Sequence, residues 1–78
     1  MSLSDAIRKR VAYFLKQKNM NLWKLFKASG VPISTLSAFM NERTELVQLD
    51  TLLHICEGLG ITITEFFEDD IFLEAEQD

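Results

Sequence analysis

The sequence predicts an all-α domain of five helices. Apolar residues recur at steps of three and four over most of the 78 residues, which is the spacing of amphipathic helices. Gly30 and Gly60 stand where two of these stripes end, and the single proline, Pro32, stands where another begins. Alternation typical of a strand is confined to residues 61–64, and this run is too short to make a sheet.

The first two helices are delimited by polar caps and a glycine. Residues 4–18 carry an apolar stripe, and Ser4 is the expected N-cap. Asn21 is expected to cap a second helix over residues 22–29. Gly30 is expected to end that helix, because glycine adopts the left-handed conformation of a helix C-terminus without strain. A sharp turn should follow.

Three further helices are expected after this turn. Pro32 can begin the third, which runs to about residue 41, since its ring presets φ and its missing N–H is not needed there. The fourth covers residues 49–59 and ends at the second of the two glycines. Thr62 and Glu65 form a capping-box pattern that begins a short fifth helix, which ends at residue 67.

The chain is expected to form one domain over residues 1–78, with a folded core over about 4–67 and an acidic tail over 68–78. The tail contains three adjacent apolar residues, Ile71, Phe72 and Leu73. They could contact a second copy of the chain or pack back on the first helix, and the sequence favours neither arrangement.

Composition excludes several classes of protein. Cys56 is the only cysteine, so neither an intrachain disulfide nor a cysteine-rich zinc site can form. His54 has no second ligand or nucleophile at helical spacing, and the sequence lacks a nucleophile motif and a phosphate-cradling glycine loop. No signal peptide and no run of ~20 apolar residues is present. We therefore expect a cytoplasmic protein that is not an enzyme and has no metal or cofactor.

Charge is divided unevenly along the chain. The net charge is −4, yet residues 1–27 hold seven basic side chains and one acidic one, whereas residues 28–78 hold eleven acidic side chains and one basic one, Arg43. This division is consistent with a phosphate-facing basic surface or with two solvated helix faces of opposite sign. Both interpretations stay open on the sequence alone.

Residues 21–41 have the spacing of a helix-turn-helix, in which one helix crosses the DNA backbone and the next enters the major groove. On a helical wheel, the third helix has a side that is expected to face the core and consists of Thr35, Leu36, Phe39 and Met40. The other side is small and polar, and consists of Ser34, Ser37, Ala38 and Asn41. Small residues let a helix approach base edges, and Ser and Asn offer donors and acceptors.

The chain resembles the phage-repressor and Cro-type (XRE-like) helix-turn-helix family over about residues 7–67. The matching segments are Gly30-Val31, Ser34-Thr35-Leu36-Ser37, Thr51-Leu52-Leu53, Gly58-Leu59-Gly60-Ile61 and Glu65-Phe66-Phe67, together with Leu25, Phe39, Asn41, Ile55 and Cys56. The resemblance implies a five-helix repressor-like fold whose third helix reads DNA. It implies base-facing positions at Ile33, Ser34, Ser37 and Ala38. It also places Asn21, Arg43 and Thr44 near phosphates, and we add Lys24 and Asn41 to that phosphate-contacting set.

The chain departs from the family pattern at the contact between the first and third helices. The family commonly has an Arg–Glu ion pair where this chain has Leu15 and Met40. Replacing both members of a buried pair by packed apolar residues is often neutral or stabilising, so we predict that these two side chains touch. Phe26 stands where a small residue is usual, and its ring should point elsewhere or widen the separation of the second and third helices.

The expected function is sequence-specific binding of double-stranded DNA by a small bacterial transcriptional regulator, with the third helix in the major groove. We expect a homodimer whose recognition helices lie ~34 Å apart. We expect no membrane association and no small-molecule ligand. The alternative is a protein-interaction module that keeps this fold with weak or no DNA binding, which the acidic net charge, the apolar Ile33 and Ala38, and Leu22 in place of the family's glutamine would suit.

Overall fold

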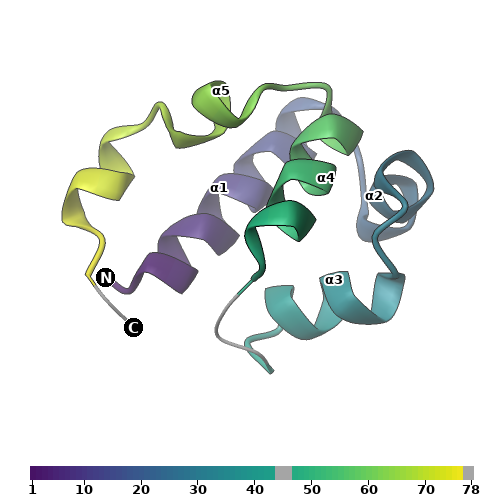
Figure 1. Cartoon of the computed structure of the whole chain (residues 1–78), viewed down its shortest axis with the longest axis horizontal. Helices are drawn as coiled ribbons and strands as arrows, with labels where there is room; N and C mark the ends of the chain where they lie inside the picture. The colour runs from purple at the N-terminus through teal and green to yellow at the C-terminus, as the bar shows by residue number, and fades with distance from the viewer. Residues whose placement is uncertain (44–46, 77–78) are drawn as a thin grey trace.

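The described part of the chain, residues 1–43 and 47–76 of a computed structural model, is all-α. Its five α-helices and one 3-10 helix are α1 (Leu3–Gln17), α2 (Leu22–Ser29), α3 (Ile33–Met40), α4 (Leu49–Leu59), α5 (Ile63–Phe67) and η1 (Asp70–Glu74) (Figure 1). The five-helix prediction is confirmed. None of the described helices is long and apolar enough to span a membrane.

The start of α1 differs from the prediction, because Ser2 and not Ser4 is its N-cap. The Ser2 hydroxyl accepts a hydrogen bond from the backbone N–H of Asp5 at 3.1 Å, and Ser4 is buried within the helix. Ser2 is fixed in an extended conformation by backbone pairing with Glu76, whose carbonyl accepts from Leu3 N at 2.9 Å. This pairing between the two ends of the described chain has no signature in the sequence.

The predicted ends of α2, α4 and α5 are confirmed, whereas Pro32 is the N-cap residue of α3 and not its first helical residue. The Asn21 side chain accepts from the backbone N–H three residues on at 2.8 Å and so caps α2. Gly30 and Gly60 end α2 and α4 with φ values of 78° and 73°, in the left-handed region that favours glycine. Thr62 and Glu65 form the reciprocal capping box of α5, with bonds of 3.0 and 3.1 Å.

The core draws apolar side chains from all five α-helices. Its largest fully buried side chains are Phe66, Leu25, Leu52, Val11 and Cys56. The helices α2 and α4 approach closely at Gly58, where an added Cβ would lie 2.7 Å from the Cβ of Ser29. A glycine is therefore needed at this crossing, and its packing orients the first helix of the helix-turn-helix.

The segment after α5 packs back onto the domain. The Phe72 ring lies 4.8 Å from the Phe67 ring and 6.1 Å from the Phe66 ring, between centroids, and Phe72 packs against the core. Leu73 is 84% exposed. Of the two arrangements considered for the tail, packing against the domain therefore accounts for Phe72, and Leu73 stays available for other contacts.

Candidate nucleic-acid interface

The helix-turn-helix consists of α2, the turn at residues 30–32, and α3, which lies along one edge of the molecule (Figure 1). Leu36 and Phe39 point into the core and hold α3 on the domain. Val31, in the turn, is also buried. Leu36, Phe39 and Met40 therefore pack as the helical wheel predicts, whereas Thr35, also expected in the core, is exposed at the edge of the packed side. The opposite side of α3 is left for contacts outside the domain.

The outer face of α3 carries the four predicted base-facing residues. Ile33 is 39% exposed and Ser34 is exposed, while Ser37 and Ala38 are half-buried. Ser34 and Ala38 also border a shallow groove between α3 and the start of α4, whose far wall includes Val47 and Thr51. The four residues thus share one face of α3, on which Ser34, Ser37 and Ala38 are small and Ile33 is large.

The end of α3 is closed by a Schellman motif without its usual glycine. Arg43 N donates to the Ala38 carbonyl at 2.8 Å and Glu42 N to the Phe39 carbonyl at 3.1 Å. Glu42 stands at the left-handed position, with φ of 60°. This geometry turns the chain back along the helix, so that Asn41 and Arg43 lie beside Ser37 on α3.

Two side chains from this turn meet on one hydroxyl. Asn41 Nδ2 donates to Ser37 Oγ at 3.0 Å, and Arg43 Nη2 donates to the same oxygen at 3.1 Å. Two predicted phosphate-contacting residues and one predicted base-facing residue therefore form a single exposed cluster. Thr44, also predicted to contact phosphate, lies outside the described residues.

The remaining predicted phosphate contacts, Asn21 and Lys24, lie at the start of α2. The Asn21 side chain accepts from Lys24 N, and both residues are exposed. Trp23, between them, is 53% exposed, and the ammonium of Lys27 lies 5.8 Å from its ring centre. The described contacts do not join this group to the Ser37 cluster, so the structure presents the predicted site as two groups on the helix-turn-helix.

Arg8 fixes the position of α3 and was missed as a positioning residue. Its guanidinium donates through Nε to the Phe39 carbonyl at 2.6 Å and lies 4.8 Å from the Phe39 ring centre. The same group pairs with Asp5 at 2.9 Å and with Glu42 at 4.0 Å. A cation at the last turn of α3 is favourable because unpaired carbonyls gather there.

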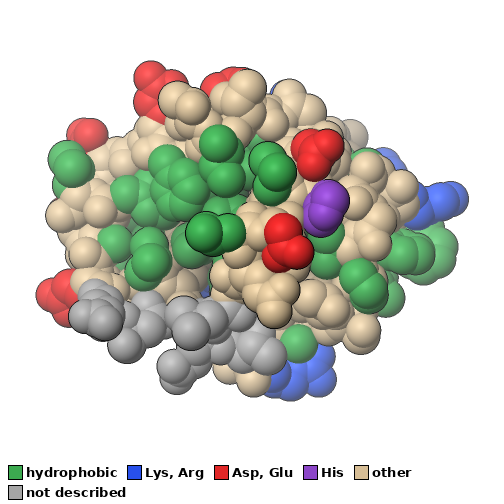
Figure 2. Space-filling view, viewed as in Figure 1, with side chains coloured by type: hydrophobic (Ala, Val, Ile, Leu, Met, Phe, Trp, Pro, Cys, Tyr) green, Lys and Arg blue, Asp and Glu red, His purple; other side chains and the backbone are tan. Residues whose placement is uncertain are grey.

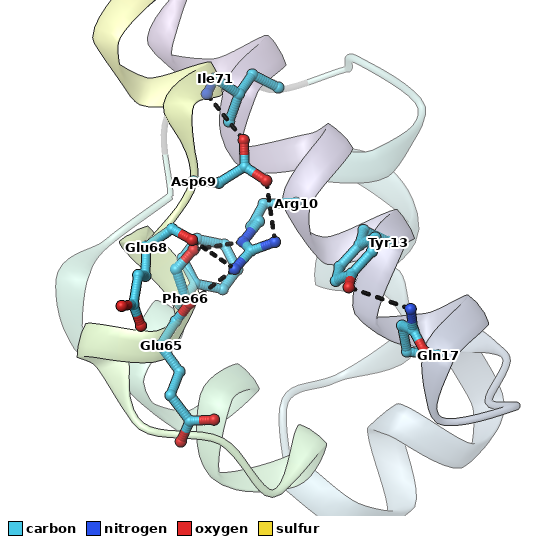
Figure 3. Close-up of polar contacts among 8 residues, drawn as sticks. All are labelled: Arg10, Tyr13, Gln17, Glu65, Phe66, Glu68, Asp69 and Ile71. Carbon is cyan, nitrogen blue, oxygen red and sulfur yellow. Dashed lines mark hydrogen bonds and ion pairs between the residues drawn. The ribbon is translucent and has the colours of Figure 1, made fainter.

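Arg10 holds α5 and the following segment against α1 (Figure 3). Its guanidinium donates to the carbonyls of Phe66, Glu65 and Glu68 at 2.7, 2.8 and 3.2 Å, and pairs with Asp69 at 3.3 Å. The other carboxylate oxygen of Asp69 accepts from Ile71 N at 2.8 Å, which links Arg10 to the start of η1. The side chain is stacked on Phe14, with 4.5 Å to the ring centre.

These two arginines change the interpretation of the charge distribution. Arg8 and Arg10 are only 9% and 8% exposed, so two of the seven bases among residues 1–27 serve helix ends inside the domain. The five lysines of this half are all exposed. A sequence signal was available for Arg10, which stands three residues after Ile7 and four before Phe14, on the apolar stripe itself.

The departures from the family pattern are accommodated by packing. Leu15 and Met40 both pack against the core while half-buried, and their mutual contact stays a prediction. Phe26 is half-buried against the core, with its ring centre 5.4 Å from that of Trp23. The large ring therefore lies beside Trp23 on α2.

Neither the cysteine nor the histidine forms a reactive site in the described structure. Cys56 is fully buried, and loss of solvation raises the pKa of its thiol from 9.0 to about 11, which disfavours the nucleophilic thiolate. His54 lies 3.4 Å from Glu57 on the exposed side of α4. Within residues 1–43 and 47–76, no group of three or more potential ligands is placed to hold a metal ion.

Comparison with known proteins identifies the family of the chain. Residues 10–70 match the model of the Cro/C1-type helix-turn-helix DNA-binding domain. No match was found among curated proteins or among solved structures. The family match covers most of the chain and contains α2, the turn and α3. The chain therefore belongs to the Cro/C1-type helix-turn-helix DNA-binding family.

Proposed function

We propose that this chain is a transcriptional regulator that recognises a DNA sequence by placing α3 in the major groove. The observation that carries the proposal is the outer face of α3, where small or exposed residues, Ile33, Ser34 and Ala38, leave the helix able to approach base edges. A regulator of this kind would act in the cytoplasm of a bacterial cell.

Two polar groups, one at each end of the helix-turn-helix in the sequence, support contacts with phosphate. Arg43 and Asn41 follow α3, and Lys24 with Asn21 begins α2, so the two groups bracket the helix-turn-helix in sequence. Arg43 is exposed and keeps N–H groups beyond the one bound to Ser37. Contacts to phosphate from these residues would fix the orientation of α3 without reading sequence.

The salt dependence of binding to random-sequence duplex tests this proposal. Each phosphate contact should contribute a slope of about −0.9 to a plot of log affinity against log salt concentration. Arg43→Ala should weaken binding to random-sequence duplex and reduce the slope by about 0.9. Lys16→Ala removes the same charge from a hollow shared with Tyr13 and Gln17 and should leave the slope unchanged.

If the chain does not bind duplex even at low salt, the result would favour the alternative function, a protein-interaction module with this fold. An equal effect of Arg43→Ala and Lys16→Ala would also reject the proposed interface, because it would indicate attraction by net charge alone. Binding with a slope that only Arg43→Ala changes would support it.

We also propose that the regulator is a homodimer that forms through an apolar face of α4, α5 and η1. Figure 2 shows hydrophobic side chains gathered between these elements. The exposed apolar residues on the three elements are Leu49, Leu53, Ile63, Phe67 and Leu73, with exposed fractions between 36% and 84%. Burial of such a face against a second copy would present two recognition helices to two half-sites.

Charge around this face gives the dimer proposal a distinctive test. Residues 47–76 contain no Lys or Arg, so a symmetric contact brings like charges together and should strengthen when salt screens them. Sedimentation should therefore show more dimer at higher salt, whereas DNA binding weakens. Leu73→Glu should shift the monomer–dimer equilibrium toward the monomer. Trp23→Ser, on α2 and outside this face, is the control and should leave the equilibrium unchanged. A monomer at all salt concentrations would reject the dimer.

A further inference from the structure

The start of the outer face of α3 pairs an apolar side chain with a hydroxyl. Ile33 occupies the first position of α3 and Ser37 stands one turn further on. Residues at this spacing are neighbours on a helix surface, with Cβ atoms about 5–6 Å apart. Ile33 is 39% exposed, so its branched apolar side chain is available for contact outside the domain. These two side chains would face the same region of the major groove.

The hydroxyl of Ser37 has a restricted role. A serine oxygen accepts two hydrogen bonds and donates one. Both acceptor positions of Ser37 are filled, by Asn41 Nδ2 at 3.0 Å and by Arg43 Nη2 at 3.1 Å. Toward DNA, therefore, this hydroxyl can act only as a donor, and it is mismatched against a base edge that also presents a donor.

Among the four bases, thymine alone presents in the major groove an acceptor beside a methyl group. Its O4 accepts and its C5 methyl is apolar, whereas cytosine presents an N4 donor and guanine presents acceptors without a methyl. Adenine presents an acceptor and a donor. The pair of Ile33 and Ser37 complements thymine in both respects.

We propose that Ile33 and Ser37 together read one thymine in each half-site, with Ile33 against the methyl and the Ser37 hydroxyl donating to O4. The proposal rests on the proposed function, since it requires α3 in the major groove. It makes Asn41 and Arg43 determinants of specificity as well as phosphate contacts, because they fix the Ser37 oxygen as a donor. No arginine or glutamine side chain contacts the base in this discrimination.

Four related bases separate the two contacts. A duplex is first enriched by the native chain from a random-sequence pool, and each thymine in it is then replaced in turn. Uracil keeps O4 and lacks the methyl, 5-methylcytosine keeps the methyl and replaces the acceptor by a donor, and cytosine changes both. At one thymine per half-site, uracil should weaken binding about fourfold, the effect of one buried methyl group. 5-Methylcytosine should weaken it about tenfold or more, as for a mismatched pair.

Variants assign each effect to its side chain. Ile33→Ser should abolish the difference between thymine and uracil and keep the penalty for 5-methylcytosine. Ser37→Ala should do the reverse. Asn41→Ala frees one acceptor position on Ser37, so the penalty for 5-methylcytosine should shrink. Gln17→Ala, at the exposed end of α1, is the control and should change neither ratio.

The outcomes separate this inference from the function on which it rests. Absence of salt-sensitive duplex binding overturns the proposed function. Salt-sensitive binding with no thymine at which uracil weakens the complex overturns the thymine contact alone. A thymine–uracil difference that persists in Ile33→Ser also overturns it, because the methyl would then be read by another side chain.

Discussion

Replacement of Arg10 by methionine tests how much of the stability depends on one buried guanidinium. Methionine keeps an unbranched apolar stem and removes every N–H donor. The carbonyls of Glu65, Phe66 and Glu68 would lose their charged partner, at a guanidinium that is only 8% exposed. Hydrogen bonds to charged groups contribute about 1.5–3 kcal/mol each and are not additive. We expect Arg10→Met to lower the free energy of unfolding by about 3–5 kcal/mol.

This loss is a large part of the total, which for 78 residues is about 4–12 kcal/mol. Urea denaturation followed by circular dichroism measures this loss of unfolding free energy. The native chain and the variant should be compared with the same dependence of unfolding free energy on urea concentration. Asp69→Asn is the matched control, because its carboxylate is 44% exposed and contributes only one bond of 3.3 Å to Arg10. That change should cost less than about 1 kcal/mol. A loss below about 1 kcal/mol for Arg10→Met would refute the reasoning and indicate that water replaces the guanidinium.

Three further predictions concern single positions. Glu42→Gly should raise the free energy of unfolding by about 1 kcal/mol, since φ of 60° strains any side chain, and a lower urea midpoint would show that the Glu42 contact with Arg8 outweighs the strain. Gly58→Ala should cost about 1–3 kcal/mol in the same assay because its Cβ would lie 2.7 Å from that of Ser29, and an unchanged midpoint would contradict the close crossing. The raised pKa of Cys56, about 11, means that the folded state holds a proton that the unfolded state releases above pH 9. Stability should therefore fall between pH 9 and 11 more steeply in the native chain than in Cys56→Ala, as measured by thermal unfolding, and parallel curves would argue against it.

The helices were predictable because their signals are local. Asn21, Gly30 and the Thr62–Glu65 box each act within four residues, so the sequence is sufficient to place the ends of α2, α4 and α5. The N-cap of α1 could not be predicted in this way, since Ser2 is held in place by pairing with Glu76, which is distant in the sequence. A long-range contact of this kind leaves no periodic pattern.

The positions of the candidate residues on α3 could be predicted from the sequence, and the contacts among their side chains could not. The helical wheel places Ser34, Ser37 and Ala38 on one side of α3, and the structure agrees. The convergence of Asn41 and Arg43 on Ser37 depends on the left-handed residue after α3, which is a glutamate here and gives no glycine signal. Counting charges also overstated the basic surface, because the count does not distinguish a solvated lysine from a guanidinium inside the domain.

The two buried arginines of α1 bind both to α3, in the candidate nucleic-acid interface, and to α5, in the proposed dimer face. Arg8 reaches the last turn of α3 and Arg10 reaches the end of α5, and only one residue separates them along the helix. In the proposed dimer through α4, α5 and η1, the distance between the two copies of α3 would depend on these two contacts of α1 and on the crossing of α2 and α4 at Gly58. Changes in α1, a helix that need not touch DNA, would then alter the half-site spacing that the dimer accepts.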